Sequence, residues 1–332
     1  MDEASVATEY RKQHPQIVTS ELPVGHLSLA ELSDNSVSDR VTQLSLRADL
    51  YAPSDQTLTL VECKRSLNVR AIGQLLTYAR LFDTDRELLR TRFRQRCGLD
   101  PYPEDVIAPH TNSNGSEQSV RPVIDHLDLR IAVNELPSKA RNGLLRACEY
   151  HGIAVDYFEH GGWTRLTDQV SIDRTVKPTV SPGSRTYNQQ YTSLAEQASP
   201  EVQSDTEEEV LRRMGLDDVD GHTFREIPLT GNDSAEVGGI RADVIVLPES
   251  EGPLYAIELK DGTGHGGNAR SYYTGVGQSL CAAALCELEL NIRTVPILGF
   301  GSLPAIGGYL TIDTPTGIPW GEIWPTVHGG AE

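Results

Sequence analysis

The sequence predicts an α/β protein of two tandem domains, each with a mixed central sheet flanked by helices. Three observations support this fold class. The chain has 332 residues, about two domains at roughly 150 residues each. Short alternating apolar runs, typical of strands, are followed by runs with helical spacing. A segment near residue 50 recurs near residue 245, which indicates duplication of a whole domain rather than a short repeat.

The repeated segment is predicted to be two strands followed by a helix. Residues 47–64 (RADLYAPSDQTLTLVECK) and 241–260 (RADVIVLPESEGPLYAIELK) both begin with Arg-Ala-Asp and end with Glu-x-Lys. Turn-rich residues separate two apolar runs in each, so a hairpin-like strand pair is expected. A Gly-Gln pair then lies on an apolar helical run in both repeats, starting at Gly73 (GQLLTYARLF) and Gly277 (GQSLCAAALC).

The remaining pattern of the first domain predicts the order β-β-α-insertion-β-α-β. The predicted elements are a helix over 71–82, an insertion loop over 100–122, a strand over 128–134, a helix over 138–151 capped by Ser138 and ended by Gly152, and a strand over 153–159.

The predicted boundaries divide the chain into three parts. Residues 1–165 form the first domain. Residues 166–204 are rich in Ser, Thr, Pro and Gln and are expected to be a polar linker. Residues 205–332 form the second domain, which opens on the helix-like SDTEEEVLRRMGL and continues through the apolar runs TVPILGF and GYLTID.

Composition excludes several classes of protein. No stretch of 18 apolar residues is present, so no membrane-spanning helix is expected. The acidic start, MDEASVATEY, is unlike a signal peptide, and five cysteines without a CxxC pair indicate buried thiols in a reducing cytoplasm. The formal net charge of −18 with only five lysines is typical of adaptation to high salt. The net charge is therefore attributed to the solvent rather than to a binding partner, and it does not exclude DNA as a partner.

The first repeat carries a candidate metal site. Side chains two apart on a strand share a face, so Glu62 and Lys64 point the same way, and the paired strand brings Asp49 beside them. Two carboxylates bind a hard divalent cation, Mg²⁺ or Mn²⁺, and the backbone carbonyl of Cys63 can complete its coordination. A neighbouring lysine orients or deprotonates a water, or stabilises the charge that develops on a phosphate.

The second repeat carries the same set. Asp243, Glu258 and Lys260 recur with the carbonyl of Leu259 in place of that of Cys63. Two of the five lysines therefore stand in Glu-x-Lys positions. An arginine there would not take part in a proton transfer near neutral pH, which favours a chemical role for both lysines.

Asp-x(12–14)-Glu-x-Lys on consecutive strands resembles the PD-(D/E)XK nuclease superfamily, which has the restriction-endonuclease-like fold. VECKRSLNVRAIGQLLTYARLF, followed by PSKARNGLLRACEYHGIAVDYFE, is similar to archaeal mismatch-specific endonucleases and RecB-type nuclease domains. The resemblance covers roughly residues 5–160, and 205–300 more thinly.

The resemblance also implies further site residues. Gln74 and Tyr78 match a Gln-x-x-x-Tyr element that positions the DNA strand or the lysine. An acid on the first helix is expected at the metal, with Glu9 as the candidate in the first domain and Glu209 or Glu208 in the second. The second repeat keeps Gln278 but has Ala282 where the tyrosine would stand.

Charge is distributed unevenly along the chain. Residues 62–97 hold nine basic and four acidic residues, a local +5, whereas residues 201–332 hold seven basic and 21 acidic residues, a local −14. Basic side chains near the first metal motif are candidates for phosphate contacts. These candidates are Arg65, Arg70, Arg90, Arg92, Arg94 and Arg96.

Together these features predict a cytoplasmic, Mg²⁺- or Mn²⁺-dependent DNA endonuclease of repair, restriction or defence. Its two domains would act as an internal pseudo-dimer, each cutting one strand. Two alternatives stay open. One or both domains are inactive and form a DNA-binding or assembly module, or the acidic second domain serves dimerisation or a partner protein. A homodimer and a repair or defence protein are the partners considered besides DNA.

Overall fold

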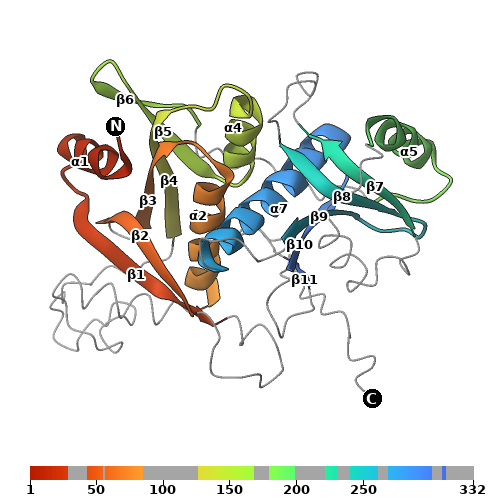
Figure 1. The fold of residues 1–332 in the computed structure, drawn as a ribbon, viewed down its shortest axis with the longest axis horizontal. Helices are drawn as coiled ribbons and strands as arrows, with labels where there is room; N and C mark the ends of the chain where they lie inside the picture. Colours follow the sequence, from red (N-terminus) through yellow and green to blue (C-terminus); the bar gives the residue numbers. More distant parts are fainter. Residues whose placement is uncertain are drawn as a thin grey trace, which may run out of the picture.

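The computed structural model describes residues 1–28, 43–54, 57–84, 126–167, 179–198, 221–229, 240–260, 268–300 and 309–311. The fold is mixed α/β with two mixed sheets and flanking helices, so the predicted class is confirmed. Figure 1 shows the two sheets on either side of a layer that contains α2, α4 and α7. No helix among the described residues is long and apolar enough to cross a membrane.

The first sheet has six strands in sequence order, β1-β2-β3-β4-β5-β6. The pairs β1–β2, β2–β3 and β5–β6 are antiparallel, and β3–β4 and β4–β5 are parallel. The elements of this first unit are α1 (Glu3–Gln13), β1 (Val18–Ser28), β2 (Gln43–Ser54), β3 (Thr57–Ser66), α2 (Val69–Thr84), β4 (His126–Glu135), α4 (Arg141–Tyr150), β5 (Ile153–Glu159) and β6 (Gly162–Arg165).

The second sheet has five strands in the order β11-β10-β9-β8-β7. The β9–β10 pair is parallel and the other pairs are antiparallel. The elements of this second unit are α5 (Arg185–Gln197), β7 (Gly221–Pro228), β8 (Arg241–Pro248), β9 (Leu254–Lys260), α7 (Asn268–Leu290), β10 (Thr294–Phe300) and β11 (Tyr309–Thr311).

The two sheets repeat one another over four strands. In both, the first three described strands pair antiparallel, a helix follows the third strand, and the fourth strand pairs parallel to the third. Parallel neighbours need such a crossover helix, here α2 and α7. The units diverge afterwards, because β4 is followed by a parallel strand and β10 by an antiparallel one.

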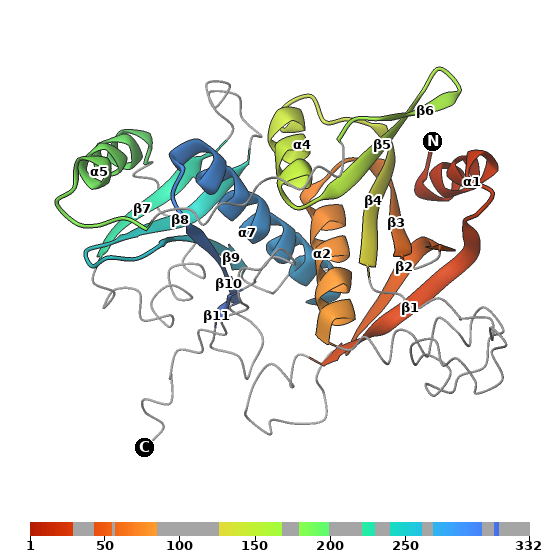
Figure 2. The same cartoon turned by 180° about the vertical axis from the view of Figure 1, so that it is seen from behind.

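A continuous apolar core joins the two units. It contains residues from the inner faces of both sheets and from α2, α4 and α7 between them. Figure 2 shows α7 lying against α2 from the opposite side. Contacts across the units include Tyr150 of α4, whose hydroxyl donates to buried Glu287 of α7, and the ring of His151, which meets the carbonyl oxygen of Leu280 at 3.2 Å.

The two central helices approach so closely that their crossing requires glycine. A Cβ on Gly73 would overlap the carbonyl oxygen of Tyr273 and lie 2.6 Å from the nitrogen of Gly277. A Cβ on Gly277 would overlap the carbonyl oxygen of Val69 and lie 3.1 Å from the nitrogen of Gly73. Because Val69 and Tyr273 each precede their glycine by four residues, the contact is reciprocal, as it is across a two-fold axis.

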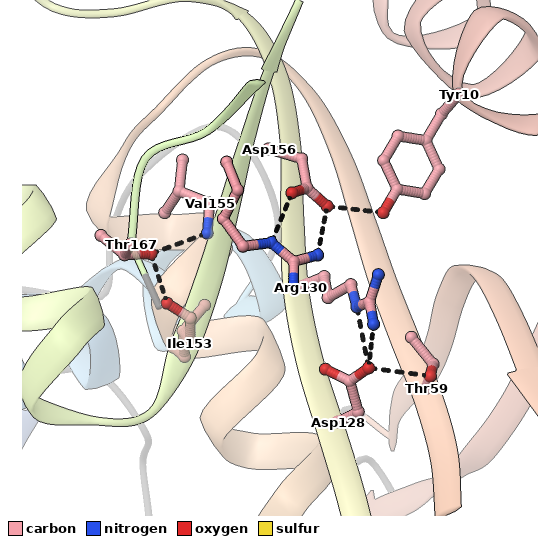
Figure 3. A network of polar contacts seen from close by, with 9 residues as sticks. Tyr10, Thr59, Asp128, Arg130, Ile153, Val155, Asp156 and Thr167 are labelled. Atoms are coloured by element: carbon pink, nitrogen blue, oxygen red, sulfur yellow. Dashed lines mark hydrogen bonds and ion pairs between the residues drawn. The ribbon is translucent and has the colours of Figure 1, made fainter. Parts of the chain in front are cut away.

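The outer face of the first sheet is covered by α1, which is held by a polar network (Figure 3). The hydroxyl of Tyr10 donates to Asp156 of β5 at 2.6 Å, and Arg165 of β6 donates to the same carboxylate at 2.9 Å. Arg130 of β4 donates to Asp128 at 2.8 Å, which also accepts from Thr59 of β3 at 3.0 Å. The contact of Tyr10 ties the C-terminal half of α1 to β5, and the other contacts join neighbouring strands of the sheet.

Several segments differ from the sequence prediction. Strands β1 and β6 are absent from the predicted order of the first domain. Helix α4 begins at Arg141 rather than at Ser138, because residues 138–140 form a turn and no side chain caps the helix. It ends as expected before Gly152, whose φ of 67° is a conformation that glycine adopts without strain. The predicted linker, 166–204, contains α5, which packs on β7. The buried apolar residues of α5 are Tyr187 and Leu194, which are seven residues apart and therefore share one helix face.

Candidate metal centre

The candidate site lies where the second and third strands of the first sheet separate. The β2–β3 ladder ends at the pair Leu50 and Val61. The next position beyond this pair holds an acid on each strand, Asp49 on β2 and Glu62 on β3. The backbone N–H of Cys63 is therefore available to a side chain, and it donates to Oδ2 of Asp49 at 2.8 Å. The end of the ladder thus places a carboxylate from each strand beside the same short stretch of backbone.

Lys64 bridges the two carboxylates. Its Nζ lies 2.7 Å from Oε2 of Glu62 and 3.2 Å from Oδ2 of Asp49. Glu62 and Lys64 point to the α2 face, whereas the thiol of Cys63 lies in the apolar cluster beneath α1. The structure therefore brings together the three side chains of the first predicted motif. The side chain of Asp49 is 35 % exposed and connects the site to solvent.

Burial sets the charge state of this group. Glu62 is fully buried, which raises its pKa to about 7 although the neighbouring Lys64 ammonium opposes the rise. Burial alone would lower the pKa of Lys64, but the charges of Glu62 and Asp49 outweigh it and raise the pKa above the usual range. Lys64 is therefore a cation near neutral pH, and a further positive charge would favour ionised Glu62.

The second unit repeats the geometry. The β8–β9 ladder ends at the pair Val244 and Ile257, and the next position beyond this pair again holds an acid on each strand. The N–H of Leu259 donates to Oδ2 of Asp243 at 2.7 Å. Lys260 forms an ion pair with Glu258, which is 1 % exposed. Burial, and then the charge of Asp243, raise the pKa of Glu258 to about 8.

One carboxylate oxygen in each site is buried without a hydrogen-bond partner among the described residues. These atoms are Oε1 of Glu62 and Oε2 of Glu258. A buried acceptor left unsatisfied in this way costs free energy, and a bound cation removes that cost. No group of three or more His, Cys, Asp or Glu side chains within the described part of the chain is placed to hold a metal. Two carboxylates still fit Mg²⁺, which commonly keeps several waters.

The predicted helix residues of the first site lie beside Glu62. Nε2 of Gln74 lies 3.4 Å from the hydroxyl of Tyr78, and both side chains are buried. Tyr78 and Glu62 interact electrostatically, and the carboxylate contributes to the raised pKa of the phenol. In the second unit Gln278 is half-buried on α7, and Ala282 is buried at the position of the tyrosine. The two sites therefore share their acids and lysine but differ on the helix side.

Helix α1 carries two acids, Glu9 of the sequence prediction and Glu3. Glu9 pairs with Lys12 at 2.7 Å, and the side chain of Glu9 is 25 % exposed. The charge of Glu3, in the first helical turn, contributes less than the charges of Glu62 and Asp49 to the raised pKa of Lys64. Glu3 and Glu9 each stand three residues from the buried Val6, so helical spacing in the sequence does not separate the two acids. Glu209 and Glu208 lie outside the described residues.

The predicted DNA-contacting arginines are only partly described. Arg65 is exposed and pairs with Glu135 at 2.9 Å. Arg70, in the first turn of α2, has a buried Nε without a hydrogen-bond partner among the described residues. Arg90, Arg92, Arg94 and Arg96 fall outside the described part of the chain, so the proposed basic patch stays a prediction.

Comparisons with protein-family models, with curated proteins and with solved structures find no match to the chain.

Proposed function

We propose that the chain is a divalent-metal-dependent DNA endonuclease made of two restriction-endonuclease-like units. The observation that carries the proposal is the recurrence of one constellation in both units. In each unit, an Asp and a Glu occupy the first positions beyond the end of the ladder between two antiparallel strands. The Asp carboxylate accepts a hydrogen bond from the backbone N–H of the residue after the Glu. In each, a lysine pairs with a buried Glu that keeps one unsatisfied oxygen.

The residues divide the chemistry between them. Asp49 and Glu62 would hold Mg²⁺ or Mn²⁺, with the carbonyl of Cys63 as a further oxygen. When bound, the ion polarises a phosphodiester and lowers the pKa of an attacking water. Lys64 is a buried cation, so its Nζ is suited to stabilise negative charge on the phosphate rather than to accept a proton. Asp243, Glu258, Lys260 and the carbonyl of Leu259 would act likewise in the second unit.

We further propose that the units cooperate as an internal pseudo-dimer. Both sites face the helix layer that joins the sheets, and the reciprocal crossing of α2 and α7 relates the units as a two-fold axis relates subunits. Each site would cut one strand of a DNA duplex. Double-strand cleavage that survives intact in both Asp49→Ala and Asp243→Ala would contradict this part of the proposal.

A second candidate function is favoured by the difference between the two sites in the residues that α2 and α7 contribute. Ala282 replaces the tyrosine, and the chain from residue 201 onward carries a formal charge of −14 from seven basic and 21 acidic residues. The second unit would then bind no DNA and serve a partner or a scaffold. In that case Lys260→Ala leaves every cleavage product unchanged, whereas Lys64→Ala abolishes them.

The direct test is a cleavage panel at high salt with Mg²⁺. The substrates are plain duplex, mismatched duplex, branched DNA and supercoiled plasmid, and the enzymes are wild type, Lys64→Ala, Lys260→Ala and the double variant. We expect the wild type to cleave at least one substrate, EDTA to stop it, and the double variant to lose about 100-fold or more in rate. The matched control is Lys12→Ala, an exposed lysine of α1 that should cleave normally. Equal cleavage by wild type and double variant would overturn the proposal.

A further inference from the structure

We propose that Tyr273, a residue of the second unit, is a positioning residue of the first metal centre. The inference rests on the proposed function of that centre. Tyr273 is a buried residue of α7. It packs on Tyr78, which lies beside Glu62, so the second unit would complete the first site by holding one of its side chains in place.

The contact between the two tyrosines is an edge-to-face pair inside the shared core. Their ring centroids are 6.5 Å apart and the rings are inclined by 76°. Tyr78 is 1 % exposed and Tyr273 is 5 % exposed. Such pairs stabilise the packing beyond the burial of their area, and they favour one orientation of each ring. The orientation of the Tyr78 phenol therefore depends on a side chain from the other sheet's helix.

The position of Tyr273 is fixed by the backbone rather than by its side chain alone. Its carbonyl oxygen lies where a Cβ of Gly73 would be, so α7 contacts the backbone of α2 at this point. Tyr78 follows Gly73 by five residues on α2 and Tyr273 precedes Gly277 by four on α7. Because both helices are locked at the crossing, the Tyr273 ring has little freedom to move away from Tyr78.

Tyr78 is the link between Tyr273 and the metal ligands. Its hydroxyl lies 3.4 Å from Nε2 of Gln74, and its phenol interacts electrostatically with the carboxylate of Glu62. Removing the Tyr273 ring would leave a cavity beside Tyr78, into which the phenol can turn. The side chain that lines Glu62 would then lose its fixed orientation, and a small displacement at a catalytic centre is costly to rate.

The arrangement runs in one direction only. The reciprocal crossing relates each α2 position to the α7 position 204 residues later, since 277 minus 73 is 204. By this relation the counterpart of Tyr273 is Val69 and the counterpart of Tyr78 is Ala282. The second site therefore has no equivalent tyrosine pair, and the second unit supports the first without being supported in the same way.

The experiment measures the first site alone. The background is Asp243→Asn, which removes the charge of the second site's aspartate and keeps a hydrogen-bond acceptor for Leu259. In this background we compare Tyr273→Ala, Tyr273→Leu, Tyr273→Phe and Tyr150→Ala. Tyr150 is the matched control because it is a buried tyrosine at the same inter-unit contact, on α4, and it bonds to Glu287 instead. The readouts are nicking of supercoiled plasmid over a Mg²⁺ titration and Mn²⁺ binding by calorimetry.

We expect Tyr273→Ala to lower the nicking rate of the folded protein by about tenfold or more and to raise the Mg²⁺ concentration that gives half the maximal rate. Tyr273→Phe keeps the ring and should behave as the background does, whereas Tyr273→Leu should lose several-fold. Tyr150→Ala should lose stability with no change in the rate of its folded fraction. If Tyr273→Ala does not fold, Tyr273→Leu gives the result.

Two outcomes overturn the inference, and they are distinguishable. Unchanged rate and unchanged Mg²⁺ dependence in folded Tyr273→Leu, with an active background protein, would overturn the positioning role alone. A background and a wild type that neither nick plasmid nor bind Mn²⁺ would overturn the proposed function and the inference with it.

Discussion

Gly73 and Gly277 face each other where α2 crosses α7, and each lies against a backbone carbonyl of the opposite helix, that of Tyr273 or Val69. A Gly-Gln pair recurs in both halves of the sequence. Its glycine permits the close helix packing, and its glutamine is a candidate residue of the metal site. The crossing joins the cores beneath both sheets into one, so the stability of the two units is coupled.

Alanine at either glycine is expected to destabilise the whole molecule. The added methyl would overlap a carbonyl oxygen that the packed helix cannot move, so we expect a loss of about 3 kcal/mol or more in the free energy of unfolding of Gly73→Ala and of Gly277→Ala. Urea unfolding followed by circular dichroism measures the change. Gly162→Ala is the control, since a Cβ there meets nothing within 4 Å, and it should unfold as the wild type does.

The stability of the metal-free protein should fall as the pH rises from about 5 to 8. Burial raises the pKa of Glu62 to about 7 and that of Glu258 to about 8, both above the usual 4.5, so the folded state binds protons more tightly than the unfolded state. Stability is then greatest at low pH and is lost as the pH rises through this window, on the order of 1 kcal/mol per unit for each group. The raised pKa of Lys64 changes the stability only above about pH 10, so it does not alter the dependence between pH 5 and 8.

Thermal unfolding at several pH values, with and without Mg²⁺, tests this dependence. The double variant Glu62→Gln and Glu258→Gln should show a flatter profile, because neither amide titrates. Mg²⁺ should stabilise the wild type at pH 8 and leave the double variant unchanged. A wild-type profile parallel to that of the double variant would show that the two carboxyls do not titrate in this range.

The acid on α1 that matters for the first site is expected to be Glu3. Its charge acts on Lys64, whereas Glu9 is paired with Lys12 and lies six residues further, about 120° around the helix. We expect Glu3→Gln to lower Mg²⁺-dependent cleavage several-fold and Glu9→Gln to leave it unchanged. Each replacement removes one negative charge from α1, so they serve as controls for one another. The reverse order of effects would restore Glu9 as the metal-side acid.

Much of the fold followed from local pattern. The strands that carry the acids, the Glu-x-Lys spacing and the helix after each repeat were predictable, because strand alternation and helical spacing are properties of a few consecutive residues. The approach of Asp49 to Glu62 was also predictable, since a strand pair with a short connection brings them together. The structure places these elements as expected, although α4 begins three residues later.

The missed features depend on contacts between segments far apart in sequence. Choosing Glu3 over Glu9 requires the rotation of α1 on the sheet, which the contact of Tyr10 with Asp156 determines. Helix α5 has few buried positions and is ordered by packing on β7. The pairing of Tyr78 with Tyr273 depends on the crossing of α2 and α7, and a single helix pattern carries no information about its partner.

The reciprocal helix crossing has a genetic consequence. Two identical subunits meeting in this way would carry every substitution twice, once on each side of the axis. A single chain that contains both halves is free of that constraint, so a tyrosine can occupy one side of the crossing while valine or alanine occupies the other. A single chain can therefore encode different roles for its two halves, whereas a symmetric pair of identical subunits cannot.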